Sequence, residues 1–236
     1  MRALKSAKNA GVKRVVLTSS MVSMLKNADK SILIDSESWT NVDSPNVSAY
    51  AKSKTLAEKS AWEFIKNQDK TSLMELTVIN PGPVFGPTLS NNLEGASMSM
   101  FKQMIIGKMP MLPQAAINMS DVRDVAKIQV LSLENKNANG KRFIVTTQQP
   151  YSFQQVAKLL KSNGYNKVGT KLAPNFLLKF LGIPPNKFTT PFFPTKLQAN
   201  SWLFTLVTSL PLIYNLPPDI GMRPMIAFSN VDFPAP

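Results

Sequence analysis

The sequence contains no cysteine and no histidine. These absences exclude disulfides, thiolate nucleophiles, imidazole bases and nearly every zinc or haem site, because each of them depends on sulfur or imidazole. Any catalysis must therefore come from Ser, Tyr, Lys, Asp or Glu, with or without a cofactor. No metal site is expected.

Acidic residues are scarce in the second half of the chain. None lies between Glu134 and Asp219, whereas ten Lys or Arg do, and the formal net charge is +13. Such a charge suits an anionic partner: nucleic acid, acidic lipid or a phosphorylated cofactor. The basic residues are dispersed and lack interleaved aromatics, so a solvated lysine-rich surface is favoured and no nucleic-acid partner is expected.

Long apolar runs are also missing. The first residues show no apolar segment followed by a small-residue cleavage site, so no secretory signal is predicted and the expected compartment is cytoplasmic. The run SWLFTLVTSLPLIY is shorter than the roughly 20 residues of a membrane span and is interrupted by Pro211, so no membrane is expected as a partner. With 44% hydrophobic residues in 236 positions, the chain can bury a sizeable core.

Strand and helix patterns alternate along the chain. KRVVLTSS (13–20) and LMELTVINPGPVFGP (73–87) are typical of buried strands, and Ser48 to Gln68 between them shows the pattern of an amphipathic helix. GKRFIVTT (140–147) is a third predicted strand. Strand, helix and strand in this order predict an α/β fold with a parallel sheet.

Further helices are predicted after the second strand. One is closed by Gly107, and the next starts from Ser120 as its N-cap. A third has Ser152 and Gln155 at capping-box spacing and ends at Gly164.

Tyr50 and Lys54 lie four residues apart on the predicted helix, hence on one face. The ammonium of Lys54 can lie near the phenol and favour the phenolate. Such a tyrosine can give a proton to a carbonyl oxygen as a hydride arrives at the carbon. In a lysine-rich chain this spacing alone is a weak signal.

The strand ends strengthen the signal. VVLTSS places Ser19 and Ser20 at the carboxyl end of a parallel strand, where open α/β sheets bind ligands. Ser20 precedes Tyr50 by 30 residues, and Pro81, at the end of the next strand, follows it by 31. A turn serine bonded to its own backbone is the more frequent role for a serine. The combination of these features favours a site.

The chain resembles the extended short-chain dehydrogenases/reductases of the NAD-dependent epimerase/dehydratase superfamily, in particular the dihydroflavonol-reductase and aldehyde-reductase-like branch. The resemblance covers about residues 1–165 and is carried by GVKRVVLTSSMVS, DSESWT, SAYAKSKTLAEKSAWEF, LTVINPGPVFGP, SDVRDVA and GKRFIVTTQQPYSFQQVAKLL. It implies a Rossmann-like parallel sheet and an NAD(P)-dependent oxidoreductase acting on CH-OH groups. The cofactor would be NADP or NAD, with NADP favoured, and the partner a small-molecule carbonyl or alcohol substrate. A homodimer is left open.

The resemblance also implies roles for individual residues. Ser20 would orient the substrate carbonyl, and Tyr50 would be the general acid/base. Lys54 would bind the nicotinamide ribose and favour the tyrosine phenolate. Together with Tyr50 and Lys54, the residues expected to bind the cofactor are Thr18, Ser19, Pro81, Gly82, Pro83 and Val84.

Two departures from the family pattern stand out. The sequence has no G-x-x-G-x-x-G turn for the pyrophosphate, and its first strand resembles the family's fifth. About a hundred residues of a complete member are therefore expected to be absent, including those that choose NAD or NADP, and this chain alone is expected to be a fragment with little activity. Beyond about residue 193 the family pattern is not found.

The implied domains follow from this match. A partial NAD(P)-binding Rossmann domain is expected at 1–88 and about 120–147. A substrate-binding region is expected at about 89–119 and 148–193, with an atypical tail at 194–236. Two other functions stay open: nucleotide-sugar epimerase or dehydratase chemistry, which the same Ser, Tyr and Lys serve, and a non-catalytic cofactor-binding or interaction remnant.

Overall fold

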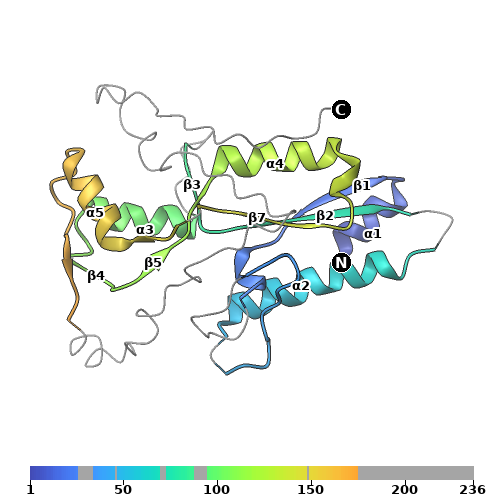
Figure 1. Ribbon diagram of the computed structural model, residues 1–236, viewed down its shortest axis with the longest axis horizontal. Helices are drawn as coiled ribbons and strands as arrows, with labels where there is room; N and C mark the ends of the chain where they lie inside the picture. The colour runs from blue at the N-terminus through green and yellow to red at the C-terminus, as the bar shows by residue number, and fades with distance from the viewer. Residues whose placement is uncertain (26–33, 46, 70–72, 88–94, 148, 175–236) are drawn as a thin grey trace. The chain divides into compact units, whose positions relative to one another are not determined.

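The computed structural model describes residues 1–25, 34–45, 47–69, 73–87, 95–147 and 149–174 (Figure 1). These residues form two compact units. The first contains Met1–Gly82 and Arg123–Val145, and the second contains Pro83–Val122 and 146–174. The predicted tail lies outside the described residues, and the division into a cofactor domain and a substrate-binding region stays a prediction.

The first unit is built on a three-stranded parallel sheet in the order β1-β2-β7. Its strands are β1 (Arg14–Thr18), β2 (Glu75–Pro81) and β7 (Arg142–Val145). Thr18 pairs with Ile79, and Pro81 pairs with Val145, so the carboxyl ends of the strands lie along one edge. The predicted α/β fold with a parallel sheet is confirmed.

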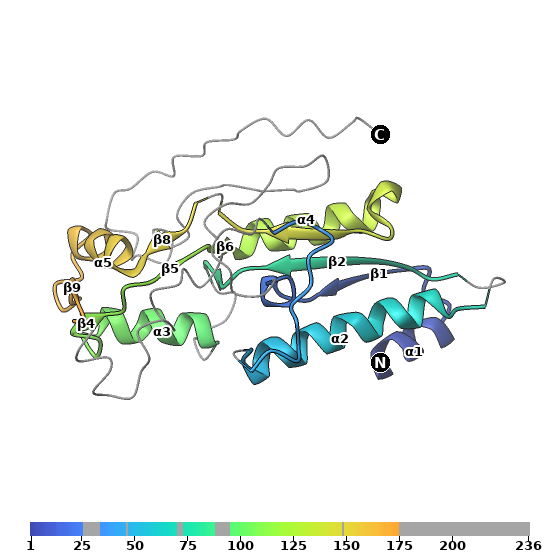
Figure 2. The same ribbon diagram turned by 60° about the horizontal axis from the view of Figure 1, so that its bottom comes forward.

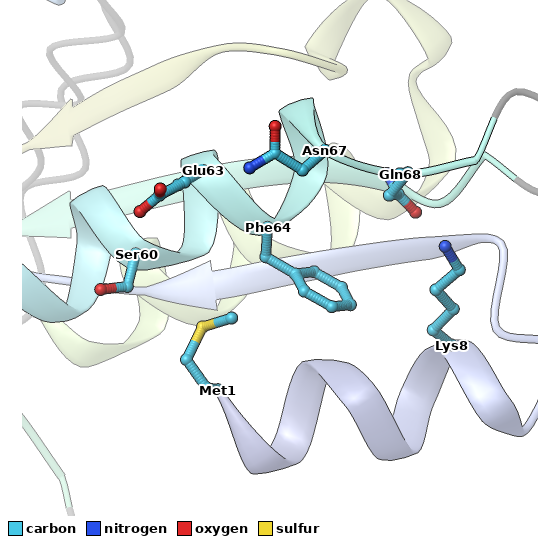
Figure 3. Close-up of a pocket in the computed structure, with 7 residues that line it drawn as sticks. All are labelled: Met1, Lys8, Ser60, Glu63, Phe64, Asn67 and Gln68. Carbon is cyan, nitrogen blue, oxygen red and sulfur yellow. The ribbon is translucent and has the colours of Figure 1, made fainter.

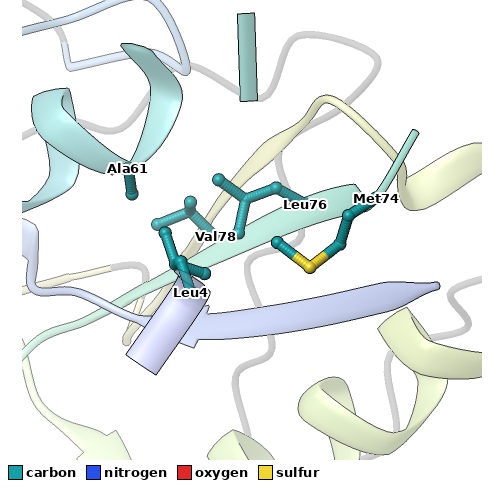
Figure 4. Packing of buried hydrophobic residues seen from close by; sticks show 5 residues of the cluster. All are labelled: Leu4, Ala61, Met74, Leu76 and Val78. Atoms are coloured by element: carbon teal, nitrogen blue, oxygen red, sulfur yellow. The ribbon is translucent and has the colours of Figure 1, made fainter. Parts of the chain in front are cut away.

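Helices cover both faces of this sheet. Figures 1 and 2 show α1 (Arg2–Asn9) and α2 (Ala49–Lys66) on one face and α4 (Val122–Glu134) on the other. Leu76 and Val78 of β2 are fully buried. Figure 4 shows them gathered with Leu4, Ala61 and Met74 in one apolar cluster. Burial of each of the larger side chains stabilises the unit by roughly 1.5–3 kcal/mol, which fixes α1 and α2 on the sheet.

The ends of α1 and α2 follow from local sequence. Ser48 caps α2, because its Oγ accepts a hydrogen bond from the Ala51 amide at 3.1 Å. After α1, Gly11 takes a positive φ of 73° and the Val12 amide donates back to the Ala7 carbonyl at 3.0 Å. A glycine adopts this left-handed conformation without steric cost, so the helix stops there.

The first strand is less buried than the sequence predicts. Residues 14–17 are half-buried and Thr18 is exposed, whereas β2 is buried along nearly its whole length. Within the described ranges β1 pairs with β2 alone, so it is an edge strand. The prediction of a strand buried on both faces was wrong for this reason: a β-branched run shows strand propensity but not which neighbours cover it.

The second unit combines two helices with short strand pairs. Its elements are β3 (Val84–Phe85) with β6 (Ser120–Asp121), β4 (Met111–Leu112) with β9 (Lys171–Leu172), β5 (Ala116–Ile117) with β8 (Tyr151–Ser152), α3 (Ala96–Ile105) and α5 (Phe153–Ser162). The capping box of α5 is present, which confirms that prediction. Ser120 does not directly precede α4: it lies in β6, its amide donates to the Pro83 carbonyl at 2.9 Å, and Asp121 separates it from Val122, where the helix begins. The local sequence does not show that Ser120 pairs in a strand, so the prediction assigned it to the helix start.

Candidate active site

The carboxyl edge of the first unit's sheet carries several of the predicted site residues. Past the end of β1 the Ser19 amide still donates to the Ile79 carbonyl at 2.8 Å, which keeps Ser19 in line with the strand. Ser20 is extended, with φ −161° and ψ 149°, and it caps a short 3-10 turn, η1 (Met21–Ser23). At the end of β2, the Gly82 amide donates to the Val145 carbonyl at 3.3 Å. Ser19, Ser20, Pro81 and Gly82 therefore share one edge.

Helix α2 presents Tyr50 in its first turn and Lys54 one turn later. The Tyr50 side chain is 60% exposed. Lys54 Nζ donates to the Thr18 carbonyl at 3.4 Å, and Thr18 is the last residue of β1. This bond places the ammonium at the carboxyl end of the strand, two residues before Ser20.

The three serines beside β1 have different partners. Ser19 Oγ donates to Glu58 Oε2 at 2.5 Å, and Ser23 Oγ contacts the same oxygen at 2.6 Å. Ser20 Oγ accepts a long bond from the Val22 amide at 3.4 Å, and it donates to no group in the described part of the chain. The turn-serine geometry weighed for Ser20 is thus present, but it leaves the hydroxyl proton uncommitted.

Glu58 is the centre of a buried polar network that sequence reasoning missed. Its residue is 1% exposed, and Oε1 accepts a 2.6 Å bond from Arg142 Nε. Burial raises the pKa of the Glu58 carboxyl, but the attraction of the Arg142 guanidinium and the hydrogen bonds that Glu58 accepts outweigh it and hold the pKa below its ordinary value of 4.5. Glu58 is an ionised acceptor at neutral pH.

Asn80 joins this network to the main chain of Ser20. Asn80 is fully buried in β2, and its Nδ2 lies 2.8 Å from Glu58 Oε2, 2.9 Å from Ser23 Oγ and 3.2 Å from the Ser20 carbonyl. A signal for Glu58 exists in the sequence, because it follows Lys54 by four residues and Tyr50 by eight and so lies on the same helix face. The sequence does not indicate that this charge is buried.

The other predicted cofactor-binding residues are placed as follows. Thr18 Oγ1 accepts a 2.6 Å bond from Gln129 Nε2 of α4, and the Ser19 hydroxyl is held by Glu58. A contact of Ser19 with a cofactor would therefore fall to its main chain. Pro83 and Val84 belong to the second unit, and their role stays a prediction.

A surface hollow of about 310 Å³ lies elsewhere on the first unit. Figure 3 shows it between α1 and α2, with Phe64 extending toward α1 between Met1 and Lys8. Its lining contains no residue of the strand ends; the lining residues are Met1, Lys8, Ser60, Glu63, Phe64, Asn67 and Gln68. We therefore base the candidate site on the strand ends, where the polar groups converge.

Two absences hold for the described residues. They contain no group of three or more acidic side chains that could hold a metal ion. None of the helices in these ranges is both long and apolar enough to cross a membrane.

Comparison with known proteins gives one family for most of the chain. Residues 1–174 match the model of the 3-beta hydroxysteroid dehydrogenase/isomerase family. The NADPH-dependent methylglyoxal reductase GRE2 of Saccharomyces cerevisiae is 32% identical over 176 residues, which cover 69% of this chain and 51% of that protein. The cinnamoyl-CoA reductase CAD2 of Medicago truncatula is 32% identical over 160 residues, covering 66% and 47%. The chain spans about half the length of these curated relatives.

Solved structures show the same fold. The crystal structure of the yeast methylglyoxal/isovaleraldehyde reductase Gre2 complexed with NADPH matches with a TM-score of 0.60 at 27% identity, covering 76% of this chain and 62% of that one. A nucleoside-diphosphate-sugar epimerase from Pseudomonas aeruginosa matches with a TM-score of 0.68 at 14% identity, covering 87% and 65%. At that identity the likeness shows the Rossmann-type fold alone.

Proposed function

The chain belongs to the 3-beta hydroxysteroid dehydrogenase/isomerase family, and on that premise we propose that it carries the reacting groups of an NAD(P)-dependent oxidoreductase that reduces an aldehyde or ketone. One observation carries the proposal: at the carboxyl end of β1 the Ser20 hydroxyl keeps its proton uncommitted, and the Lys54 ammonium is bonded two residues away at Thr18. The two reductases at 32% identity support this chemistry, and GRE2 supports NADPH as the cofactor.

The proposed roles follow from the chemistry of each group. Ser20 donates a hydrogen bond to the carbonyl oxygen, which makes the carbon more electrophilic. Tyr50 gives its hydroxyl proton to that oxygen, and the Lys54 ammonium on the same helix face stabilises the phenolate that forms. When bound, NADPH supplies the hydride that reduces the carbonyl carbon.

The residues at the strand ends fit the nicotinamide end of this cofactor. A parallel sheet presents them at its carboxyl edge, which is where α/β folds bind nucleotides, and Lys54 adds a cation there. In this proposal the second unit is the substrate-binding region. Neither the substrate nor a homodimer follows from these observations, and both stay predictions.

We expect the 236-residue chain to have little activity alone. It contains no G-x-x-G-x-x-G turn, so the backbone amides that normally bind the pyrophosphate are not supplied by that motif. Weak NADPH binding would then limit the rate even with the reacting groups in place.

The competing functions predict different results. An epimerase or dehydratase would act on a nucleotide sugar, and the matching fold does not favour it over a reductase. A non-catalytic remnant would show no turnover that depends on Tyr50. We therefore propose the reductase, on the strength of the curated relatives.

The test is NADPH oxidation by the purified chain with a panel of aldehydes and ketones. Tyr50→Phe should lower any rate by about 100-fold or more, whereas Tyr165→Phe, which removes the hydroxyl of a half-buried tyrosine in the second unit, should not. A rate that is insensitive to Tyr50→Phe would contradict the assigned roles. A fast rate that Tyr50→Phe abolishes would support the roles and contradict the expectation of little activity.

A further inference from the structure

We infer that Glu58 and Arg142 are positioning residues that hold the turn bearing Ser20 in its reactive geometry. The inference rests on the proposed function in one respect, that Ser20 is the group contacting the substrate carbonyl. The geometry of the pair itself does not depend on that function.

The Glu58 carboxylate supports the Ser20 main chain through two intermediates. Ser23 Oγ lies 2.6 Å from Glu58 Oε2 and 2.8 Å from the Ser20 carbonyl, and Asn80 Nδ2 lies 2.8 Å and 3.2 Å from the same two acceptors. A hydroxyl has one proton and an amide two, so these protons are shared between the carboxylate and the Ser20 carbonyl. Removing the carboxylate charge would redistribute them.

Ser19 gives the carboxylate a second hold on the turn. Its 2.5 Å bond to Glu58 fixes the direction of the side chain just before Ser20. Successive side chains of an extended segment point in opposite directions. Anchoring Ser19 on Glu58 therefore leaves the Ser20 side chain turned away from the buried carboxylate, with its proton uncommitted.

Arg142 extends the same support to the loop at 36–39. Besides Glu58, its guanidinium donates from Nη1 to the carbonyls of Ser36 at 2.8 Å and Ser38 at 2.7 Å. Its Cζ also lies 3.7 Å from the centroid of the Trp39 ring. One side chain from the sheet thus holds the loop by hydrogen bonds and by a cation–π contact.

The loop at 36–39 leads to Thr40, which bonds to η1, the turn that Ser20 caps. The Thr40 amide donates to the Ser23 carbonyl at 2.9 Å, and Thr40 Oγ1 donates to the Val22 carbonyl at 2.6 Å. Two sets of contacts therefore hold the turn η1. The Glu58 carboxylate acts through Ser23, and the Arg142 guanidinium acts through the loop at 36–39.

Stability alone does not account for a charged pair in this place. Buried ion pairs lose most of their attraction to desolvation, and apolar replacements of similar volume are often as stable. The pair contributes a geometry instead, because Ser19, Ser23, Asn80 and Arg142 all donate hydrogen bonds to the Glu58 carboxylate. A glutamine at position 58 would keep one acceptor oxygen, but its NH₂ group would face donors on the other side.

The decisive experiment compares amide hydrogen exchange in Glu58→Gln with that in Glu75→Gln. Glu75 is the matched control, because it forms an ion pair of the same sheet with Arg14, at the amino ends of β1 and β2. We expect Glu58→Gln to lower the protection of the Ser23 and Thr40 amides by about tenfold or more relative to Val78 in β2. Glu75→Gln should leave that ratio unchanged.

Two results would overturn the inference. One is unchanged protection at Ser23 and Thr40 in Glu58→Gln. The other is a loss at Ser23 and Thr40 no larger than the loss at Val78, because the lower global stability expected for Glu58→Gln reduces protection at all three amides and a local role must add to it. If Glu58→Gln does not fold, Ser23→Ala keeps the ion pair but removes one of its two links to the Ser20 carbonyl, and the Val22 and Thr40 amides should then lose protection relative to Val78.

An activity measurement separates this inference from the proposed function. Where NADPH-dependent turnover is measurable, Glu58→Gln should lower kcat by about tenfold or more and leave the Kd for NADPH within about twofold. Turnover that needs Tyr50 but is unaffected by Glu58→Gln would overturn the inference. Turnover that is insensitive to Tyr50→Phe would instead count against the proposed function, and the exchange result would still decide the role of Glu58.

Discussion

Arg142 donates from Nε to Glu58 Oε1 over 2.6 Å although 84 residues separate the two in the chain. The bond joins the first residue of β7 to the middle of α2, with both side chains almost completely buried. The helix that carries Tyr50 and Lys54 is thus tied to the sheet by a charge pair as well as by the apolar cluster.

The first prediction concerns the pH dependence of stability. Because the pKa of Glu58 is lower in the folded protein than in the unfolded chain, folding favours the ionised carboxyl. This contribution is present above the unfolded pKa and is lost as the pH falls through the folded value. From about pH 6 to about pH 3, the free energy of unfolding in urea should fall more steeply in the native sequence than in Glu58→Gln.

The control for this experiment is Glu75→Gln, which leaves Glu58 in place. In Glu75→Gln, the free energy of unfolding should keep the part of its pH dependence that Glu58 causes. If Glu58→Gln and the native sequence lose stability in parallel over the same pH range, the carboxyl of Glu58 is not held in its charged form by folding.

A second prediction uses the cost of an unpaired buried charge. At neutral pH, Glu58→Gln or Arg142→Met alone should lower the free energy of unfolding by about 3–5 kcal/mol, since each single change leaves an uncompensated buried partner. The double variant Glu58→Leu with Arg142→Met removes both charges and should recover much of this loss. Urea unfolding of the three proteins would measure it, and a double variant weaker than both single ones would contradict the argument.

Much of this fold could be predicted from the sequence because its signals are local. The Ser152 capping box marks a helix start by side-chain chemistry, and it is found in the structure. The β-branched runs likewise gave strands of the parallel sheet. Ser120 shows the limit: whether a serine before a helix caps it depends on a strand partner beyond the local sequence.

The candidate site likewise contains residues that the sequence could predict and residues that it could not. Ser20, Tyr50 and Lys54 could be selected by spacing, and the structure places the Lys54 ammonium at the Thr18 carbonyl, two residues before Ser20. Glu58 could not be selected, because α2 also carries exposed charged residues such as Lys52 and Lys59, and no local feature tells a buried acid from a solvated one. Its partner Arg142 becomes a neighbour only when β7 pairs with β2.

A third prediction concerns the start of α2, where Tyr50 lies. Ser48→Ala removes the bond to the Ala51 amide and should lower the free energy of unfolding by about 1 kcal/mol. The first turn should fray, so any Tyr50-dependent rate should fall more than the loss of folded protein explains. Ser60→Ala, on the same helix but away from its end, is the control and should change both quantities little.

The final prediction is that alanine substitutions of Ser19 and Ser20 rank in opposite order in their effects on stability and on rate. Ser19 donates to a buried carboxylate, so Ser19→Ala should lower the free energy of unfolding by about 1.5–3 kcal/mol, the usual range for a hydrogen bond to a charged group. Ser20 only accepts a long bond from an amide, so Ser20→Ala should change stability by less than about 0.5 kcal/mol. If Ser20 contacts the carbonyl, Ser20→Ala should nevertheless lower kcat by about tenfold or more. The loss should be smaller in folded Ser19→Ala, where Ser23 and Asn80 still hold the Ser20 carbonyl. Urea unfolding and NADPH oxidation, measured on both variants, would show this reversal; a larger stability loss in Ser20→Ala than in Ser19→Ala would mean that the two hydroxyls have been assigned the wrong way round.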